Sequence, residues 1–198
     1  MKDYPAKNLR NVVILGHGGD GKTALTECLL YFTKAIDRLG KLVDGNTVSD
    51  FDPEEIRRKI SVSTSLAPIE YEGYKINLLD TPGYFDFAGE VVEGLEAADA
   101  AIIVVSGKSG VEVGTEKAWK YCSDYHIPCL IYISKMDEEN ADYYKVADEL
   151  RDTFGVSVCP IAIPIYEGEK VMGLVNCASM TARTFKNGVV SDCPIPAD

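Results

Sequence analysis

A glycine-rich stretch limits the folds open to this chain more than any other feature. Residues 16–23 fit the pattern G-x-x-x-x-G-K-[ST]. A short β-branched run, residues 11–15, precedes them, and helically spaced apolar residues follow from Lys22. Glycines let backbone amides turn inward around a phosphate, and a helix N-terminus adds a positive end. The sequence therefore predicts a phosphate-binding loop made of Gly16, His17, Gly18, Gly19, Asp20, Gly21, Lys22 and Thr23.

Individual residues of this phosphate loop have distinct expected roles. Lys22 is predicted to neutralise the β- and γ-phosphates of a nucleotide, and the Thr23 hydroxyl to bind Mg²⁺. Asp20 would be repelled by phosphate, so we expect its side chain to face solvent. The alternative, a glycine-rich turn without a ligand, fits poorly between a strand and a helix. The loop alone does not separate ATP from GTP, because kinases, transporters, motors and GTPases all carry it.

Apolar spacing along the rest of the chain alternates between strand and helix periods. Strands are expected at 69–72, 74–79, 100–105, 128–133 and 158–165, the first two as a hairpin around Gly73. Helices are expected from Lys22 and around 87–95, 118–122 and 143–154. Residues 37–64 show no clear periodicity, and the last thirty residues alternate only over short distances. This pattern predicts an α/β fold of the P-loop NTPase class, with a mostly parallel central sheet and helices on both faces. Ligands of such sheets bind beyond the carboxyl ends of the strands.

Composition excludes several classes of partner and location. Among 198 residues, 20 Lys and Arg stand against 31 Asp and Glu, which gives a net charge of −11. This balance argues against a duplex-DNA partner. No apolar run approaches the ~20 residues that cross a bilayer, and the first residues lack a secretory signal. The six cysteines form no Cys-x-x-Cys pair and are expected to be reduced thiols. We expect a cytoplasmic monomer with no membrane partner.

Two further motifs follow predicted strands. Asp80 begins Asp-Thr-Pro-Gly, where a carboxylate can hold a Mg²⁺ water and the Gly83 amide can bond a γ-phosphate. Asp137 ends Ser-Lys-Met-Asp, and one carboxylate can accept both N–H donors on the edge of guanine. Each motif alone is more often a turn or a solvated loop. Together with the phosphate loop they predict a guanine-nucleotide site that adds Asp80, Thr81, Pro82, Gly83, Ser134, Lys135 and Asp137.

The order of these motifs resembles the GTP-binding domain of translational GTPases, specifically elongation factor G and its bacterial paralogues. Residues 50–55, 76–87, 104–113 and 115–119 also carry the resemblance, which covers about residues 8–180. It implies Mg²⁺-dependent hydrolysis of GTP to GDP and phosphate on the ribosome, driving a conformational switch. It also implies catalytic roles for Lys22, Gly83 and Tyr84, and metal contacts from Thr23, Ser61 and Asp80. Ser61 stands where the family usually has a threonine.

Three residues depart from the elongation factor pattern. Tyr84 replaces a histidine that positions the attacking water, and a phenol is neutral at pH 7. It either bonds a water or closes an aromatic patch with Phe85 and Phe87. Ser134 replaces an asparagine, and Gly19 replaces an aspartate. We therefore expect slow hydrolysis without a ribosomal activator.

The resemblance also bears on domain organisation. Residues 1–198 correspond to a GTP-binding domain whose residues from about 165 onward resemble the start of an inserted subdomain. A base-binding Ser-Ala loop is not recognisable, so the chain resembles an N-terminal fragment that lacks C-terminal domains. The alternatives are a GTP-dependent ribosome-binding regulator with little hydrolysis, a ribosomal protection protein, and an unrelated P-loop ATPase or kinase.

Overall fold

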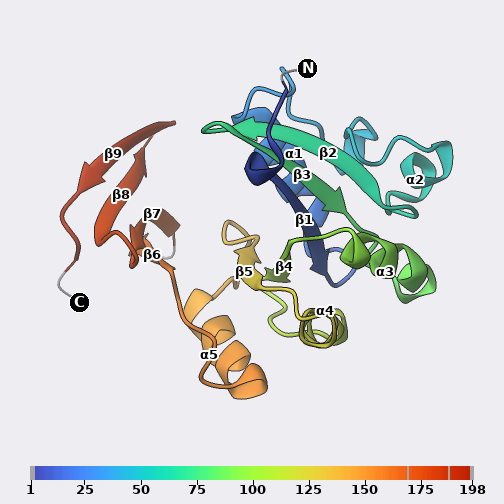
Figure 1. The fold of residues 1–198 in the computed structure, drawn as a ribbon. Coiled ribbons are helices and arrows are strands. Elements are labelled where there is room, and N and C mark those ends of the chain that lie inside the picture. The colour runs from blue at the N-terminus through green and yellow to red at the C-terminus, as the bar shows by residue number, and fades with distance from the viewer. Residues whose placement is uncertain (1–2, 169, 187, 197–198) are drawn as a thin grey trace. The chain divides into compact units, whose positions relative to one another are not determined.

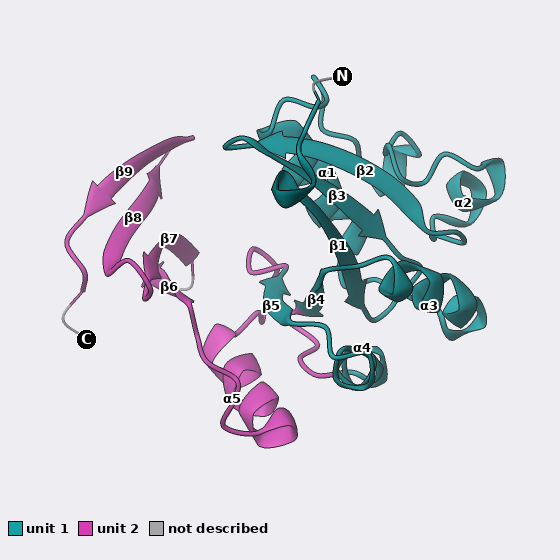
Figure 2. Cartoon of the chain, viewed as in Figure 1, with its two compact units in different colours: residues 1–105, 112–134 teal, residues 106–111, 135–198 magenta. Residues whose placement is uncertain are grey.

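The chain forms two compact units (Figure 2). The computed structural model describes residues 3–168, 170–186 and 188–196. The first unit comprises residues 1–105 and 112–134, and the second comprises residues 106–111 and 135–198. Within the described ranges, no helix is long and apolar enough to cross a membrane.

The first unit is built on a five-stranded sheet in the order β2-β3-β1-β4-β5 (Figure 1). The strands are β1 (Leu9–Gly16), β2 (Ser65–Tyr71), β3 (Tyr74–Asp80), β4 (Ala100–Ser106) and β5 (Cys129–Ser134). β1 pairs in parallel with β3 and β4, whereas β2 and β3 form the expected antiparallel hairpin. The helices that flank the sheet are α1 (Lys22–Phe32), α3 (Ala88–Glu96) and α4 (Val113–Asp124). The predicted α/β class, a mostly parallel sheet between helices, is confirmed.

Alternating side chains of β1 pack against opposite layers, as the period of two in a strand requires. Ile14 is fully buried in a cluster with Leu30 of α1, and Val12 packs against that cluster. Val13 points the other way, toward α3, where a Cβ on Gly94 would lie 3.3 Å from Val13 Cγ2. A strand that is buried on both faces explains why residues 12–15 are continuously apolar.

Residues 37–64, which lack periodicity in the sequence, are ordered by two buried carboxylates. Glu27 on α1 accepts hydrogen bonds from the amides of Gly40 and Val48 at 2.9 and 2.5 Å. Glu55 accepts from the amides of Val62 and Ser63 at 2.9 and 3.2 Å. The segment also holds a short helix, α2 (Pro53–Arg58), which the periodicity did not predict.

The signal for α2 was nevertheless present in the sequence. Asp52 caps the helix, Pro53 occupies its first turn, and Glu55 returns a hydrogen bond to the Asp52 amide at 3.1 Å. This is a capping box, an acidic residue followed three positions later by glutamate. Capping residues fix the start of a helix even where it is too short to show an apolar stripe.

The second unit contains α5 (Tyr143–Phe154) and a four-stranded antiparallel sheet in the order β6-β7-β8-β9. Its strands are β6 (Ala162–Glu167), β7 (Lys170–Asn176), β8 (Thr181–Lys186) and β9 (Val189–Cys193). The predicted strand at 158–165 is wrong at its start, because residues 158–161 are not a strand. Pro160 has no amide hydrogen to donate to a neighbouring strand, so the strand begins only after it, at Ala162 of β6. The last strands were not predicted at all.

Candidate functional site

The phosphate loop joins the end of β1 directly to the start of α1, as predicted. Three of its glycines have left-handed backbones: Gly16 (φ 141°), Gly19 (φ 92°) and Gly21 (φ 95°). Gly16 also faces β4 so closely that a Cβ would lie 2.3 Å from the Val104 carbonyl oxygen. Residues with side chains would strain these positions, so the motif's glycines are required by the local backbone.

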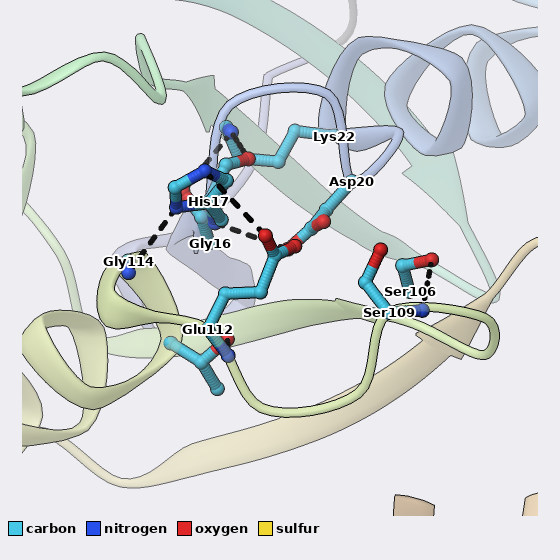
Figure 3. Close-up of polar contacts among 9 residues, drawn as sticks. Gly16, His17, Asp20, Lys22, Ser106, Ser109, Glu112 and Gly114 are labelled. Carbon is cyan, nitrogen blue, oxygen red and sulfur yellow. Dashed lines mark hydrogen bonds and ion pairs between the residues drawn. The ribbon is translucent and has the colours of Figure 1, made fainter.

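Lys22 lies across this loop. Its ammonium donates to the carbonyl oxygens of Gly16 and His17 at 3.1 and 2.8 Å, as Figure 3 shows. The residue is only 6% exposed. Burial lowers the pKa of Lys22, and the nearby carboxylates of Asp80, Asp20 and Asp50 oppose that shift. A buried ammonium at the centre of a ring of backbone groups is placed to meet an anion.

Asp80 lies at the end of β3 in surroundings that are unfavourable for a charged carboxylate. It is 1% exposed, and neither carboxylate oxygen has a hydrogen-bond partner among the described residues. Burial raises its pKa to about 6, an effect that the nearby hydroxyls of Ser49 and Thr23 reduce. An unpaired carboxylate costs free energy unless a cation or donor joins it. The donor set therefore fits a hard cation such as Mg²⁺.

The other predicted metal ligands lie in the same place. Thr23 Oγ1 is 3.3 Å from Ser61 Oγ, and Ser61 donates to Asp50 Oδ1 at 2.8 Å. Asp50 is 4% exposed, and its second oxygen has no hydrogen-bond partner among the residues described. The sequence reasoning did not single out Asp50, because one aspartate among several acidic neighbours gives no distinct signal. His, Cys, Asp and Glu alone form no cluster of three within the described residues, so the hydroxyls are needed to complete this site.

The Asp-Thr-Pro-Gly segment packs directly on the phosphate loop. A Cβ on Gly83 would lie 2.3 Å from Lys22 Nζ and 2.8 Å from the Gly18 amide nitrogen. Thr81 donates its hydroxyl to the Ile14 carbonyl at 2.6 Å and is buried. Thr81 therefore joins the ends of β3 and β1, while Gly83 is the residue that faces the loop.

Tyr84 follows and lies beside the phosphate loop. A Cβ on Gly18 would meet its ring at 3.3 Å, and the residue is 46% exposed. The Phe85 ring contacts the His17 ring edge-on, with centroids 6.0 Å apart. Lys117 Nζ lies 3.7 Å from the centroid of the Phe85 ring. Both aromatic residues line an open pocket beside α3 and α4. Tyr84 and Phe85 therefore both contact the phosphate loop, at Gly18 and at His17.

The expected solvent-facing orientation of Asp20 is wrong. Asp20 is 2% exposed, and its Oδ2 accepts the His17 amide hydrogen at 3.1 Å. Burial and the neighbouring Glu112 raise its pKa to about 6, whereas Lys22 lowers it. The prediction failed because the carboxylate is satisfied by the loop's own backbone, so it does not need water.

The base-recognition motif begins at the end of β5. Ser134 Oγ lies 2.6 Å from the Asp20 carbonyl oxygen, to which it donates, and 3.2 Å from that of Val105. The serine therefore keeps a contact with the phosphate loop. Lys135 and Asp137 follow in the second unit, where Lys135 has a left-handed backbone (φ 56°) and Asp137 is exposed. An exposed carboxylate on a tight turn is free to accept hydrogen bonds.

Together, the sheet and the phosphate loop with its buried lysine and carboxylates define a P-loop nucleotide-binding domain. A family model, the elongation factor Tu GTP binding domain, matches residues 7–192. The chain therefore belongs to the translational GTPase family, as a GTP-binding domain of the elongation factor G type.

Individual relatives agree with this assignment. An elongation factor G-like protein of Mycobacterium tuberculosis is 42% identical over 86% of the chain, and elongation factor G of Granulibacter bethesdensis is 33% identical over all of it. A crystal structure from Thermus thermophilus is 41% identical over 95% of the chain, with a TM-score of 0.89. The chain spans 24% and 29% of the length of those two curated relatives, and 28% of the solved chain.

Proposed function

We propose that this domain binds GTP and hydrolyses it to GDP and phosphate with Mg²⁺, in an elongation factor G-like protein that acts on the ribosome. The single observation that carries the proposal is Asp80, a buried carboxylate with two unpaired oxygens, close to the Thr23 hydroxyl and the Lys22 ammonium. The ribosome enters as a partner through the names of the relatives, which are elongation factors.

The residues divide the chemistry of phosphoryl transfer between them. Lys22 supplies positive charge for the β- and γ-phosphates, and the Gly83 amide lies where it can bond the γ-phosphate. Thr23, Ser61 and Asp80 would hold Mg²⁺, with Asp50 as a further oxygen donor; the ion supplies charge that offsets the developing negative charge on the phosphates. Water adds to the γ-phosphorus as the bond to the bridging oxygen breaks.

Tyr84 sets the expected rate. Its ring lies against Gly18 of the phosphate loop, and its hydroxyl would hold the attacking water by a hydrogen bond. A neutral phenol cannot provide the positive charge of an imidazolium. Hydrolysis is therefore slow until a ribosomal activator completes the site. This observation also favours the second candidate function, a ribosome-binding regulator with little hydrolysis.

The first test is calorimetric titration of the chain with GTP, GDP and ATP, each with Mg²⁺. Guanine nucleotides are expected to bind while ATP gives no signal, because Asp137 recognises guanine. Asp137→Asn should lose that preference, and Glu139→Gln, an exposed acid in the same segment, is the matched control. Equal binding of ATP to the wild type would reject the guanine assignment. Single-turnover hydrolysis with and without ribosomes then separates the two candidate functions.

The four-stranded sheet β6–β9 supports a further part of the proposal. We assign residues from about 165 onward to the start of a subdomain inserted in the GTP-binding domain. Among the described residues, its four strands form a sheet separate from the five-stranded one, and they belong to the second unit.

A further inference from the structure

Three side chains meet where the phosphate loop packs against the N-terminus of α4. They are His17 and Asp20 of the loop and Glu112, the residue that caps α4 (Figure 3). His17 Nε2 lies 3.7 Å from Glu112 Oε1, and its Nδ1 accepts the Gly114 amide hydrogen at 3.3 Å. Asp20 accepts the His17 amide hydrogen at 3.1 Å, and the neighbouring Glu112 raises the pKa of its carboxyl group. None of these contacts is used in the proposed chemistry of hydrolysis.

A negative charge on Glu112 repels a negative charge on Asp20, and a proton on Asp20 relieves that repulsion. Asp20 is buried, and the Glu112 side chain is 32% exposed. Burial and the negative charge of Glu112 both disfavour the ionised form of Asp20. The charged and titratable groups that face the pair are Lys22 from α1 and His17 from the loop. Lys22 is itself shared with Asp80 and Asp50, which limits the compensation that it gives Asp20.

The contact between α4 and the loop is tight enough to pass a change in this pair to the backbone. A Cβ on Gly114 would lie 2.5 Å from His17 Cα and 2.8 Å from its Cβ. Asp20 is bound twice within the first unit, by the His17 amide at its carboxylate and by the Ser134 hydroxyl at its carbonyl oxygen. Repulsion between ionised Asp20 and Glu112 would therefore strain the loop that surrounds the phosphates.

We propose that Asp20 is a positioning residue of the phosphate loop, that the neighbouring Glu112 carboxylate favours a proton on Asp20, and that nucleotide binding retains or takes up this proton. The inference rests on the proposed nucleotide site, because bound phosphates add negative charge next to the pair. That charge favours the protonated form, so nucleotide and proton bind cooperatively. Affinity rises as the pH falls.

The sign follows from linkage. Burial and Glu112 raise the pKa of Asp20 from its ordinary 3.8 to about 6. The folded chain thus holds more protons than the unfolded chain between about pH 4 and 6, and its stability falls as the pH rises through that window. Above this pH window, the ionised form of Asp20 lowers the free energy of unfolding by an amount that no longer changes with pH. Asp20→Asn, which mimics the protonated acid, removes both effects.

The test is the GDP affinity of the wild type, Asp20→Asn and Glu112→Gln at several values from about pH 6 to about pH 8. One linked proton changes affinity at most about tenfold per pH unit. We expect the wild type to lose affinity relative to Asp20→Asn by about tenfold across this range. The ratio of the two cancels the titration of the nucleotide's own phosphate. Glu112→Gln should also flatten the profile.

Glu116→Gln is the matched control, because Glu116 is exposed on the same helix and changes the charge equally. Its profile should follow that of the wild type. If GDP affinity changed with pH in parallel in the wild type and both variants, even at different affinities, the role would be purely structural. That result would overturn this inference but not the proposed function. Absence of GDP binding by the wild type at every pH would overturn it together with the proposed function. The unfolding midpoints of the nucleotide-free proteins give an independent readout. The midpoint of Asp20→Asn should be higher than that of the wild type at about pH 8 and equal to it at about pH 4.

Discussion

Asp20 and Asp80 are both buried beside Lys22, and burial raises the pKa of both to about 6, yet they differ in their partners. Asp20 accepts the His17 amide hydrogen, whereas both oxygens of Asp80 are unpaired among the described residues. Burial alone thus does not reveal what a carboxylate does. Its hydrogen bonds separate an acid that holds the loop from one that is open to a cation.

The substitution Asp80→Asn should have the largest effect, and it tests whether Asp80 and Asp20 have separate roles. An amide cannot supply the charge that a divalent cation needs, so the Mg²⁺-dependent part of GDP affinity should fall by about 100-fold, the upper range for loss of a residue that supports a metal. Titration with and without Mg²⁺ measures the effect. Asp20→Asn is the matched control and should keep its full response to Mg²⁺. A similar loss in both variants would mean that the two acids do not have separate roles.

The Asp20 side of the comparison is tested by Gly114→Ala. Its new methyl group would overlap His17 of the phosphate loop. Overpacking of this kind costs about 1–3 kcal/mol in the free energy of unfolding. Gly89→Ala, on α3, has open space around its Cβ and should instead gain up to ~1 kcal/mol from helix propensity. Urea unfolding distinguishes them, and an unchanged stability in Gly114→Ala would argue against a tight contact between α4 and the loop.

Ser61→Ala tests the support around Asp80. Ser61 lies between Thr23 and Asp50, so its loss leaves Asp50 without a donor and removes one candidate metal ligand. We expect about tenfold weaker Mg²⁺ dependence of GDP binding, since one hydrogen bond to a charged group contributes about 1.5 kcal/mol. Ser61→Thr keeps the hydroxyl and should retain the wild-type response. Failure of threonine to rescue would assign the effect to packing.

The smallest expected effect on affinity is that of Tyr84, which touches neither aspartate. Tyr84→Phe removes only an exposed hydroxyl and should leave GDP affinity within about twofold of the wild type. Single-turnover hydrolysis should slow in Tyr84→Phe and accelerate in Tyr84→His. Equal rates in all three proteins would remove Tyr84 from the mechanism.

Local motifs carried most of what the sequence could predict. The phosphate loop, the hairpin around Gly73 and the class of sheet follow from residues that are neighbours in the chain. Asp20 was misjudged because the sequence does not show that its carboxylate turns back onto the His17 amide of the same loop. Ser61 was placed by resemblance, but its bond to Asp50 depends on the tertiary course of residues 37–64. The start of β6 was placed too early because residues 158–161 contain apolar residues, which favour a strand, and a proline, which disfavours one.

The position of Lys22 has a consequence for ligand entry. An ammonium has three donors, and two of them are occupied by the carbonyls of Gly16 and His17, which leaves one for a phosphate. A buried lysine side chain loses about 1.5–2 kcal/mol of rotamer entropy when it is fixed. In this domain that loss accompanies folding and does not recur when a nucleotide arrives. The loop is preorganised by its own lysine, so its selectivity reflects the fit of an anion to a cation that is already in place.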